Sequence, residues 1–105
     1  MLHTGLTSDK WKIFSTDKQL LMIANELNRA KNWIDKKDFE KVSFCYERAF
    51  ELLDLTVECS KNNNLIRELL RFRELLAMTY SNKSPIFDYV LYDQLLSMNI
   101  HSFNL

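Results

Sequence analysis

The side chains that most often carry out chemistry in proteins are few in this sequence and stand far apart. The two histidines, His3 and His101, lie near opposite ends of the chain, and Gly5 is the only glycine. Cys45 and Cys59 fall on one predicted helix, roughly 21 Å apart along its axis, so they cannot form a disulfide within one chain. No Cys or His group has the spacing of a metal site, and no glycine-rich phosphate loop is present. We therefore expect no catalytic residue, cofactor, metal or small-molecule substrate.

A cluster of charged residues on the third predicted helix is the other candidate for a function. Arg67 and Arg71 are four positions apart, so they share a helix face. Like charges on one face repel one another unless carboxylates pair with them. We expect an interhelical salt-bridge network, and a site for a small anion or an acidic peptide is the functional alternative. Arg73 lies on the predicted apolar face and must pair with a carboxylate or extend to the edge. The cluster consists of Arg67, Arg71, Arg73 and Glu74. The residues of the central helix that are expected to pair with it are Glu47, Arg48 and Glu51.

Length and composition indicate a single helical domain. The chain has 105 residues, of which 47% are hydrophobic, enough for one core. One glycine and one proline leave few turn signals for a sheet. The 14 basic residues balance the 14 acidic ones, and this zero net charge disfavours nucleic-acid binding. No apolar run reaches the roughly 20 residues of a membrane span, and no signal-peptide core is present near Met1, so we expect a cytoplasmic protein.

Four stretches with helical spacing predict an all-α fold, an antiparallel three- to four-helix bundle. Thr16 is predicted to cap the first helix, with Gln19 completing a capping box. Asp38 is predicted to cap the central helix after a very short turn, and Ser84-Pro85 to start the fourth. We expect the first three helices to form the core and the fourth to cover its open side. The predicted ranges are a leader at 1–15, helices within 16–98 with the central one at Phe39–Lys61 and the third at Leu65–Tyr80, and a tail at 99–105.

The turn between the first two helices resembles part of a tetratricopeptide unit. The likeness is carried by Trp33, by Lys37-Asp38-Phe39, and by Val42, Tyr46 and Ala49. It covers Trp33 to Leu52 and implies a close helical hairpin, with the small residue Ala49 at the tightest contact. Lys37 stands where the family usually has glycine, and the pattern does not recur at the family's period of about 34 residues. The resemblance therefore implies a hairpin but not a peptide-binding superhelix.

The aromatic content indicates protein contact. The chain has seven Phe, four Tyr and two Trp residues, and several of them fall outside the predicted core stripes: Phe50, Phe72, Tyr92 and Phe103. Exposed aromatic residues on helices are typical of interfaces. We predict a small interaction module without catalytic activity, either an adaptor, a small chaperone or a homo-oligomer, with Tyr92, Ile100 and Phe103 as contact residues. The alternatives are a nucleic-acid-associated accessory protein that uses Arg67, Arg71 and Arg73, and an enzyme with a site around Glu47 and Arg71.

Overall fold

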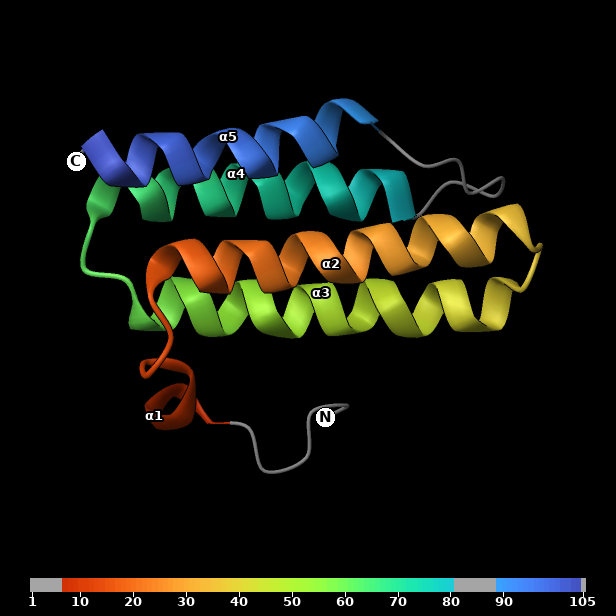
Figure 1. The fold of residues 1–105 in the computed structure, drawn as a ribbon, viewed down its shortest axis with the longest axis horizontal. Coiled ribbons are helices and arrows are strands. Elements are labelled where there is room, and N and C mark those ends of the chain that lie inside the picture. Colours follow the sequence, from red (N-terminus) through yellow and green to blue (C-terminus); the bar gives the residue numbers. More distant parts are fainter. Residues whose placement is uncertain (1–6, 81–88, 105) are drawn as a thin grey trace.

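The computed structural model describes residues 7–80 and 89–104, and all regular structure within them is α-helical (Figure 1). This confirms the predicted all-α fold. The long helices are amphipathic, and the connections on either side of α3 are three residues each, which makes the helices they join antiparallel neighbours. The helices are α1 (Ser8–Trp11), α2 (Thr16–Asp35), α3 (Phe39–Cys59), α4 (Asn63–Tyr80) and α5 (Tyr89–Asn104).

The start of α2 differs from the prediction by one residue. Ser15, not Thr16, is the N-cap, because its backbone is extended and its hydroxyl accepts a 3.2 Å hydrogen bond from a backbone N–H of the first turn. Gln19 does not complete a capping box with Thr16. Its side-chain amide donates to the carbonyl oxygens of Trp11 at 2.9 Å and Phe14 at 3.1 Å. Gln19 therefore ties the segment before α2 to the helix itself.

The turn from α2 to α3 joins a helix stop directly to a helix start. Lys37 has φ of 60°, its N–H donates to the carbonyl of Ile34, and the N–H of Asp38 donates to that of Trp33, both at 3.0 Å. This pair of hydrogen bonds around a left-handed residue is a Schellman motif. Asp38 then accepts a 3.4 Å hydrogen bond from the backbone N–H of Lys41, which confirms its predicted role as the cap of α3.

The two later helix starts have different outcomes. The run Asn62-Asn63-Asn64 predicts a turn that also caps the next helix, because Asn favours both positions. The side-chain oxygen of Asn62 accepts hydrogen bonds from the N–H groups of Asn64 and Leu65, at 3.0 and 3.1 Å, which confirms the cap of α4. The predicted start of the fourth helix at Ser84-Pro85 lies outside the described residues. At its other end α5 continues to Asn104, so most of the segment predicted as a tail is helical.

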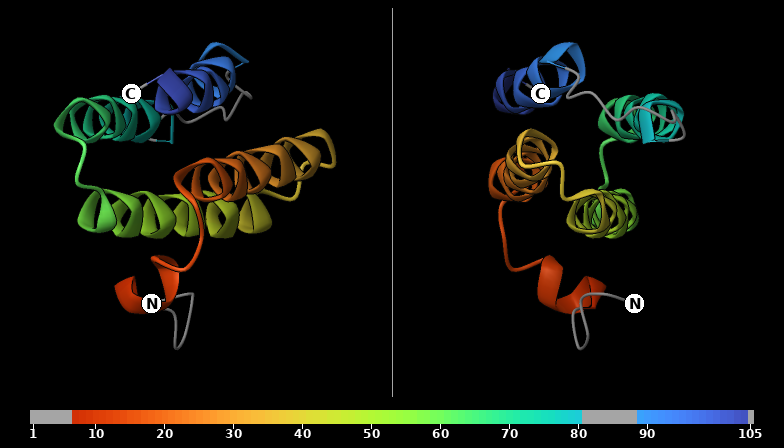
Figure 2. Two further views of the ribbon diagram at one scale, coloured as in Figure 1. Left: turned by 60° about the vertical axis from the view of Figure 1, so that its left-hand side comes forward. Right: turned by 90° about the vertical axis from the view of Figure 1, so that its right-hand side faces the viewer.

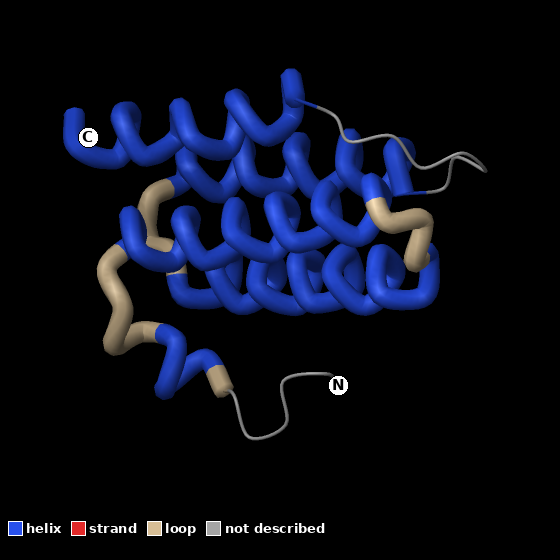
Figure 3. The backbone as a smooth tube through the Cα atoms, turned by 45° about the vertical axis from the view of Figure 1, so that its right-hand side comes forward, coloured by secondary structure: helices blue, strands red, loops and turns tan. Residues whose placement is uncertain are grey.

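The four long helices form two antiparallel layers. α2 and α3 make one layer and α4 and α5 the other, and each successive helix reverses direction (Figures 1 and 3). Viewed along the helices they occupy the corners of a square, in which α2 contacts α3 and α5, and α4 contacts α3 and α5 (Figure 2). α5 therefore covers the open side of the first three long helices, as predicted, and is a full member of a four-helix bundle.

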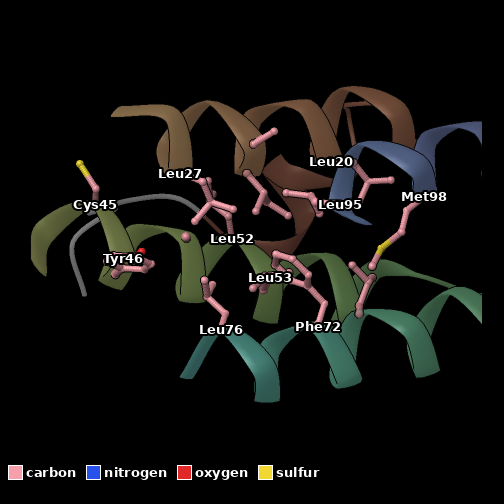
Figure 4. Packing of buried hydrophobic residues seen from close by; sticks show 14 of the residues in the cluster. Leu20, Leu27, Cys45, Tyr46, Leu52, Leu53, Phe72, Leu76, Leu95 and Met98 are labelled. Atoms are coloured by element: carbon pink, nitrogen blue, oxygen red, sulfur yellow. The ribbon is translucent and has the colours of Figure 1, made fainter. Parts of the chain in front are cut away.

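The core is built from every layer and every long helix. Leu20 from α2, Leu53 from α3, Phe72 from α4 and Leu95 from α5 are each at most 1% exposed, and their side chains converge in the centre of the bundle (Figure 4). Burying a side chain of this size contributes about 1.5–3 kcal/mol. This shared core fixes the outward faces of the helices, where a functional surface has to be sought.

The buried stripe of α4 is rotated relative to the prediction. Helical spacing predicts Leu70 on the core face of this helix and Phe72 outside it, but Phe72 is almost fully buried and Leu70 is half exposed. The reason is that α4 must face both α3 and α5, so its stripe lies between these two neighbours. The buried residues of α4 are Leu65, Leu69, Phe72 and Leu76.

The short helix α1 is docked on the outer side of the α2–α3 layer, opposite α4 and α5 (Figure 2). Trp11 is fully buried, and its indole Nε1 donates a 3.0 Å hydrogen bond to the hydroxyl of Thr56 in α3. Phe14 packs against the Trp11 ring edge to face, with 5.6 Å between ring centroids. The apolar character of Trp11 and Phe14 predicts that they dock on the bundle and hold the leader in place, and the structure confirms this.

Candidate interaction surface

The outward face of α4 combines exposed apolar side chains with charges of both signs. Leu70 and Met78 are 50% and 64% exposed, and they lie two turns apart on the side of the helix that points away from α3 and α5. Arg67, Arg71 and Glu74 are exposed around them. The two arginines predicted to share a face therefore do share one, and it is a solvent-facing one. We call these five residues the α4 face.

Beside the α4 face, a cleft of about 170 Å³ lies between α4 and α5. Its rim is polar, with exposed side chains from both helices, and its floor is apolar. A volume of this size fits one side chain of a partner, because anchoring side chains at protein interfaces insert into small apolar pockets. The lining residues are Glu68, Arg71, Phe72, Leu75, Gln94, Ser97 and Met98.

Arg73 has a different place from its two neighbours. Its guanidinium pairs with the Asp54 carboxylate of α3, with Nε 2.7 Å from Oδ1, and it lies 5.1 Å from the centroid of the Phe50 ring. Phe50 in turn contacts Tyr80, which stacks on Tyr46 at 5.2 Å. Arg73 therefore lies at the seam between α3 and α4. It extends to the exposed edge of the bundle and pairs there with a carboxylate, so both predicted alternatives hold together.

The salt-bridge network expected between α3 and α4 takes another form. The carboxylate that pairs with Arg73 is that of Asp54. Arg48 points to α2 rather than to α4, since its NH1 is 4.0 Å from Oε1 of Glu26. Within the described residues, neither Arg67 nor Arg71 forms an ion pair. The expected correspondents were wrong because the α3 residues near Glu47 and Arg48 face α2 or solvent, whereas Asp54 borders α4.

Sequence reasoning missed one polar cluster, which lies between α2 and α3. Glu26 is only 8% exposed, and its Oε1 is 3.4 Å from the guanidinium of Arg29 and 4.0 Å from that of Arg48. Its second oxygen, Oε2, and the Nε of Arg48 are buried without hydrogen-bond partners. The signal was a glutamate at a core-spaced position, three residues after Ile23 and four before Ala30.

The predicted contact residues near the C-terminus have mixed outcomes. Tyr92 is half buried and packs against the core, so it is not a protruding aromatic. The backbones of Ile100 and Phe103 lie in α5, and the described residues do not include their side chains. Their role in contacts stays a prediction. The large apolar side chains that are exposed on α3 are instead Phe39 and Phe44.

Neither cysteine has the environment of a nucleophile. Burial raises the pKa of the Cys45 thiol, and the nearby Glu26 carboxylate raises it further. Burial also raises the pKa of Cys59, whose Sγ donates to the carbonyl oxygen of Ser8 at 3.3 Å. A raised pKa lowers the thiolate fraction near neutral pH, and the thiolate is the reactive form.

Two further properties apply to residues 7–80 and 89–104. No three Cys, His, Asp or Glu side chains in this part of the chain are grouped so that they could hold a metal ion. None of its helices has the combination of length and apolar composition needed to cross a membrane.

The fold and its surfaces define an all-α four-helix bundle with a short additional helix. Comparison with protein-family models, with curated proteins and with solved structures found no match for this chain. The resemblance of the α2–α3 hairpin to a tetratricopeptide unit is therefore neither supported nor opposed by a relative.

Proposed function

We propose that this protein is a helical interaction module without catalytic activity, and that it forms a homodimer through the α4 face. The observation that carries the proposal is the exposure of Leu70 and Met78 on a helix whose other side is fully packed in the core. Exposed apolar side chains rimmed by polar residues are typical of protein contact surfaces. Removing them from water on association is the main favourable contribution.

Charge complementarity favours a second copy of the chain as the occupant. Arg71 and Glu74 are three residues apart on the α4 face. In an antiparallel pair of α4 helices, a two-fold axis midway between these residues places Arg71 of each copy beside Glu74 of the other. A two-fold interface uses the same patch twice, so both signs must be present on one patch, as they are here.

The nucleic-acid alternative draws less support from the structure. It was based on three arginines, and Arg73 is held by Asp54 and Phe50. Two exposed arginines with Glu68 and Glu74 beside them make a mixed surface rather than a basic one.

Charge-swap variants test the homodimer. The mass of the full-length chain is measured by sedimentation equilibrium over a concentration series, together with Arg71→Glu, Glu74→Arg and the double variant. We expect each single variant to dissociate, because like charges then meet across the axis, and the double variant to reassociate. Glu47→Arg, at an exposed position on α3, is the matched control and should leave the mass unchanged. A full-length chain that is monomeric at every concentration would contradict the proposal.

A further inference from the structure

The outer side of the α2–α3 layer carries four cations in a regular arrangement. Arg29 of α2 and Lys36, the C-cap residue of α2, are seven residues apart, and Lys41 and Arg48 are seven apart on α3. Seven residues are about two helical turns, so the members of each pair point to the same side. We call these four residues the basic quadrilateral.

Two side chains of α2 hold the quadrilateral together. At one end the Nζ atoms of Lys36 and Lys41 lie 5.0 and 4.1 Å from the centroid of the Trp33 ring. At the other end the guanidinium groups of Arg29 and Arg48 share one oxygen of Glu26. Glu26 and Trp33 are themselves seven residues apart, so the cations of both helices gather along one side of α2, next to α3.

Within the described residues, carboxylates neutralise only part of the positive charge of the quadrilateral. The carboxylates that pair with it are Glu26, shared between two arginines, and Asp38, which is 3.7 Å from the Nζ of Lys41. In addition, the Nε of Arg48 is buried with no acceptor. The six residues before Thr7 include no Asp or Glu, so they cannot supply the missing carboxylates.

The same side of the α2–α3 layer already binds a helical segment at its other end. Gln19, seven residues before Glu26, donates to the carbonyl oxygen of Trp11 at the end of α1. α1 therefore lies at one end of this side, with Trp11 as its anchor, and no other described helix covers the part with the quadrilateral (Figures 1 and 2). On that part, Phe44 lies between Lys41 and Arg48 and is 46% exposed, a contact point for an apolar side chain.

We propose that the basic quadrilateral binds an acidic amphipathic helix of a partner protein. A helix with Asp or Glu at seven-residue intervals presents carboxylates with the same repeat as the cations on α2 and α3, and an apolar residue between them meets Phe44. The partner's carboxylates neutralise the positive charge that Glu26 and Asp38 do not. This surface lies across the bundle from the α4 face, so the inference does not depend on the proposed homodimer.

A pair of synthetic peptides tests the inference on the full-length chain. The probe is an alanine-rich helical peptide with Glu at seven-residue intervals and Leu between them, and its control has Gln in place of Glu. Both are titrated into ¹⁵N-labelled protein, and amide chemical shifts are followed. We expect saturable shifts in residues 26–48 with the Glu peptide, an affinity that falls with added salt, and binding at least tenfold weaker for the Gln peptide.

Charge-reversal variants locate the site and separate it from the homodimer surface. The double variant Lys36→Glu, Lys41→Glu should weaken the Glu peptide at least tenfold, because both side chains are exposed and neither pairs with the buried Glu26. Lys61→Glu, an exposed charge outside the quadrilateral, and Arg71→Glu, on the α4 face, should leave the affinity unchanged. Equal binding of the two peptides, shifts centred on α4 and α5, or tighter binding of single-stranded oligothymidine than of the Glu peptide would each overturn the inference. None of these outcomes bears on the sedimentation test of the homodimer.

Discussion

The indole Nε1 of Trp11 and the hydroxyl of Thr56 are joined by a 3.0 Å hydrogen bond across 45 residues of sequence. Both side chains are fully buried, and the Thr56 hydroxyl itself donates to the carbonyl oxygen of Leu52 at 2.7 Å. The bond satisfies the one polar atom of the indole at the point where α1 meets α3. It therefore fixes where the short N-terminal helix can dock.

Thr56→Val should destabilise the protein by about 1–3 kcal/mol, because it leaves the indole N–H buried without an acceptor while nearly preserving the volume of the side chain. The measurement is the free energy of unfolding from urea denaturation. Thr79→Val is the matched control, since the Thr79 hydroxyl also donates to a backbone carbonyl of its own helix but is only half buried. A loss of similar size in both variants would show that the Trp11 bond contributes nothing specific.

Lys37→Gly should stabilise the protein by about 1 kcal/mol. Lys37 has φ of 60°, and the left-handed region costs a residue with a Cβ atom roughly 1–2 kcal/mol, part of which glycine returns as entropy of the unfolded chain. Lys37→Ala, which removes the charge but keeps the Cβ atom, should give no such gain. A Gly variant that is less stable than the wild type in thermal and chemical denaturation would contradict the role of backbone strain at this turn.

Ala49→Leu should destabilise the protein by roughly 1–3 kcal/mol through overpacking. Ala49 is fully buried on α3, and the hairpin resemblance predicts that it lies at the tightest contact with α2. Glu47→Leu introduces the same side chain at an exposed position of the same helix and serves as the control. Equal melting temperatures for Ala49→Leu and the wild type would show that the helices have room to separate at this point.

The sequence predicts those features of the fold that depend on residues close together in the chain. Asp38 as the cap of α3, the end of α3 and the asparagine turn at Asn62 depend on neighbours within a few residues. The structure has the cap and the turn as predicted, and α3 ends at Cys59, two residues before the predicted Lys61. The features that the sequence did not predict depend on contacts between helices. The apolar residues of α4 lie on several faces of the helix, so its sequence alone does not show which face is buried. Only the packing of α4 against α3 and α5 shows that Phe72 rather than Leu70 is buried.

The candidate site was less predictable than the fold for the same reason. The exposure of Arg67 and Arg71 on one face followed from their spacing, but the pairing of Arg73 with Asp54 depends on how two helices meet. Glu26 has the spacing of a core residue and the chemistry of a surface one. Its partner Arg48 comes from another helix, so sequence spacing on α2 alone could not reveal the cluster.

The stability of the protein should fall in alkaline solution because of its cysteines. Burial raises the pKa of Cys45 and Cys59 above the ordinary value of 9.0, so the folded state holds these protons at a pH where the unfolded state loses them. The stabilisation is fully present below pH 9.0 and is lost as the pH rises toward the folded-state pKa. Urea denaturation from about pH 8 to about pH 10 should show this decline. A double Cys→Ala variant should have a shallower decline, and an identical slope would contradict the assignment.

The end of α5 follows directly on two buried side chains, Leu95 and Met98. Deleting Asn99–Leu105 removes the last six of the 16 residues of α5. We expect a lower melting temperature, because the shortened helix frays where Met98 packs, while the far-ultraviolet circular dichroism per residue stays helical, because Leu20, Leu53 and Phe72 keep their places in the core.

The same deletion should also weaken self-association. Ile100 and Phe103 are predicted contact residues, and the end of α5 lies beside the start of α4, which carries Arg67 of the α4 face (Figure 1). The double variant Ile100→Ser, Phe103→Ser keeps the helix at full length and should reproduce the shift to monomer in sedimentation equilibrium. If both proteins melt at lower temperature yet keep the mass of the wild type, Ile100 and Phe103 serve only to close the end of the bundle. Association would then depend on the α4 face alone.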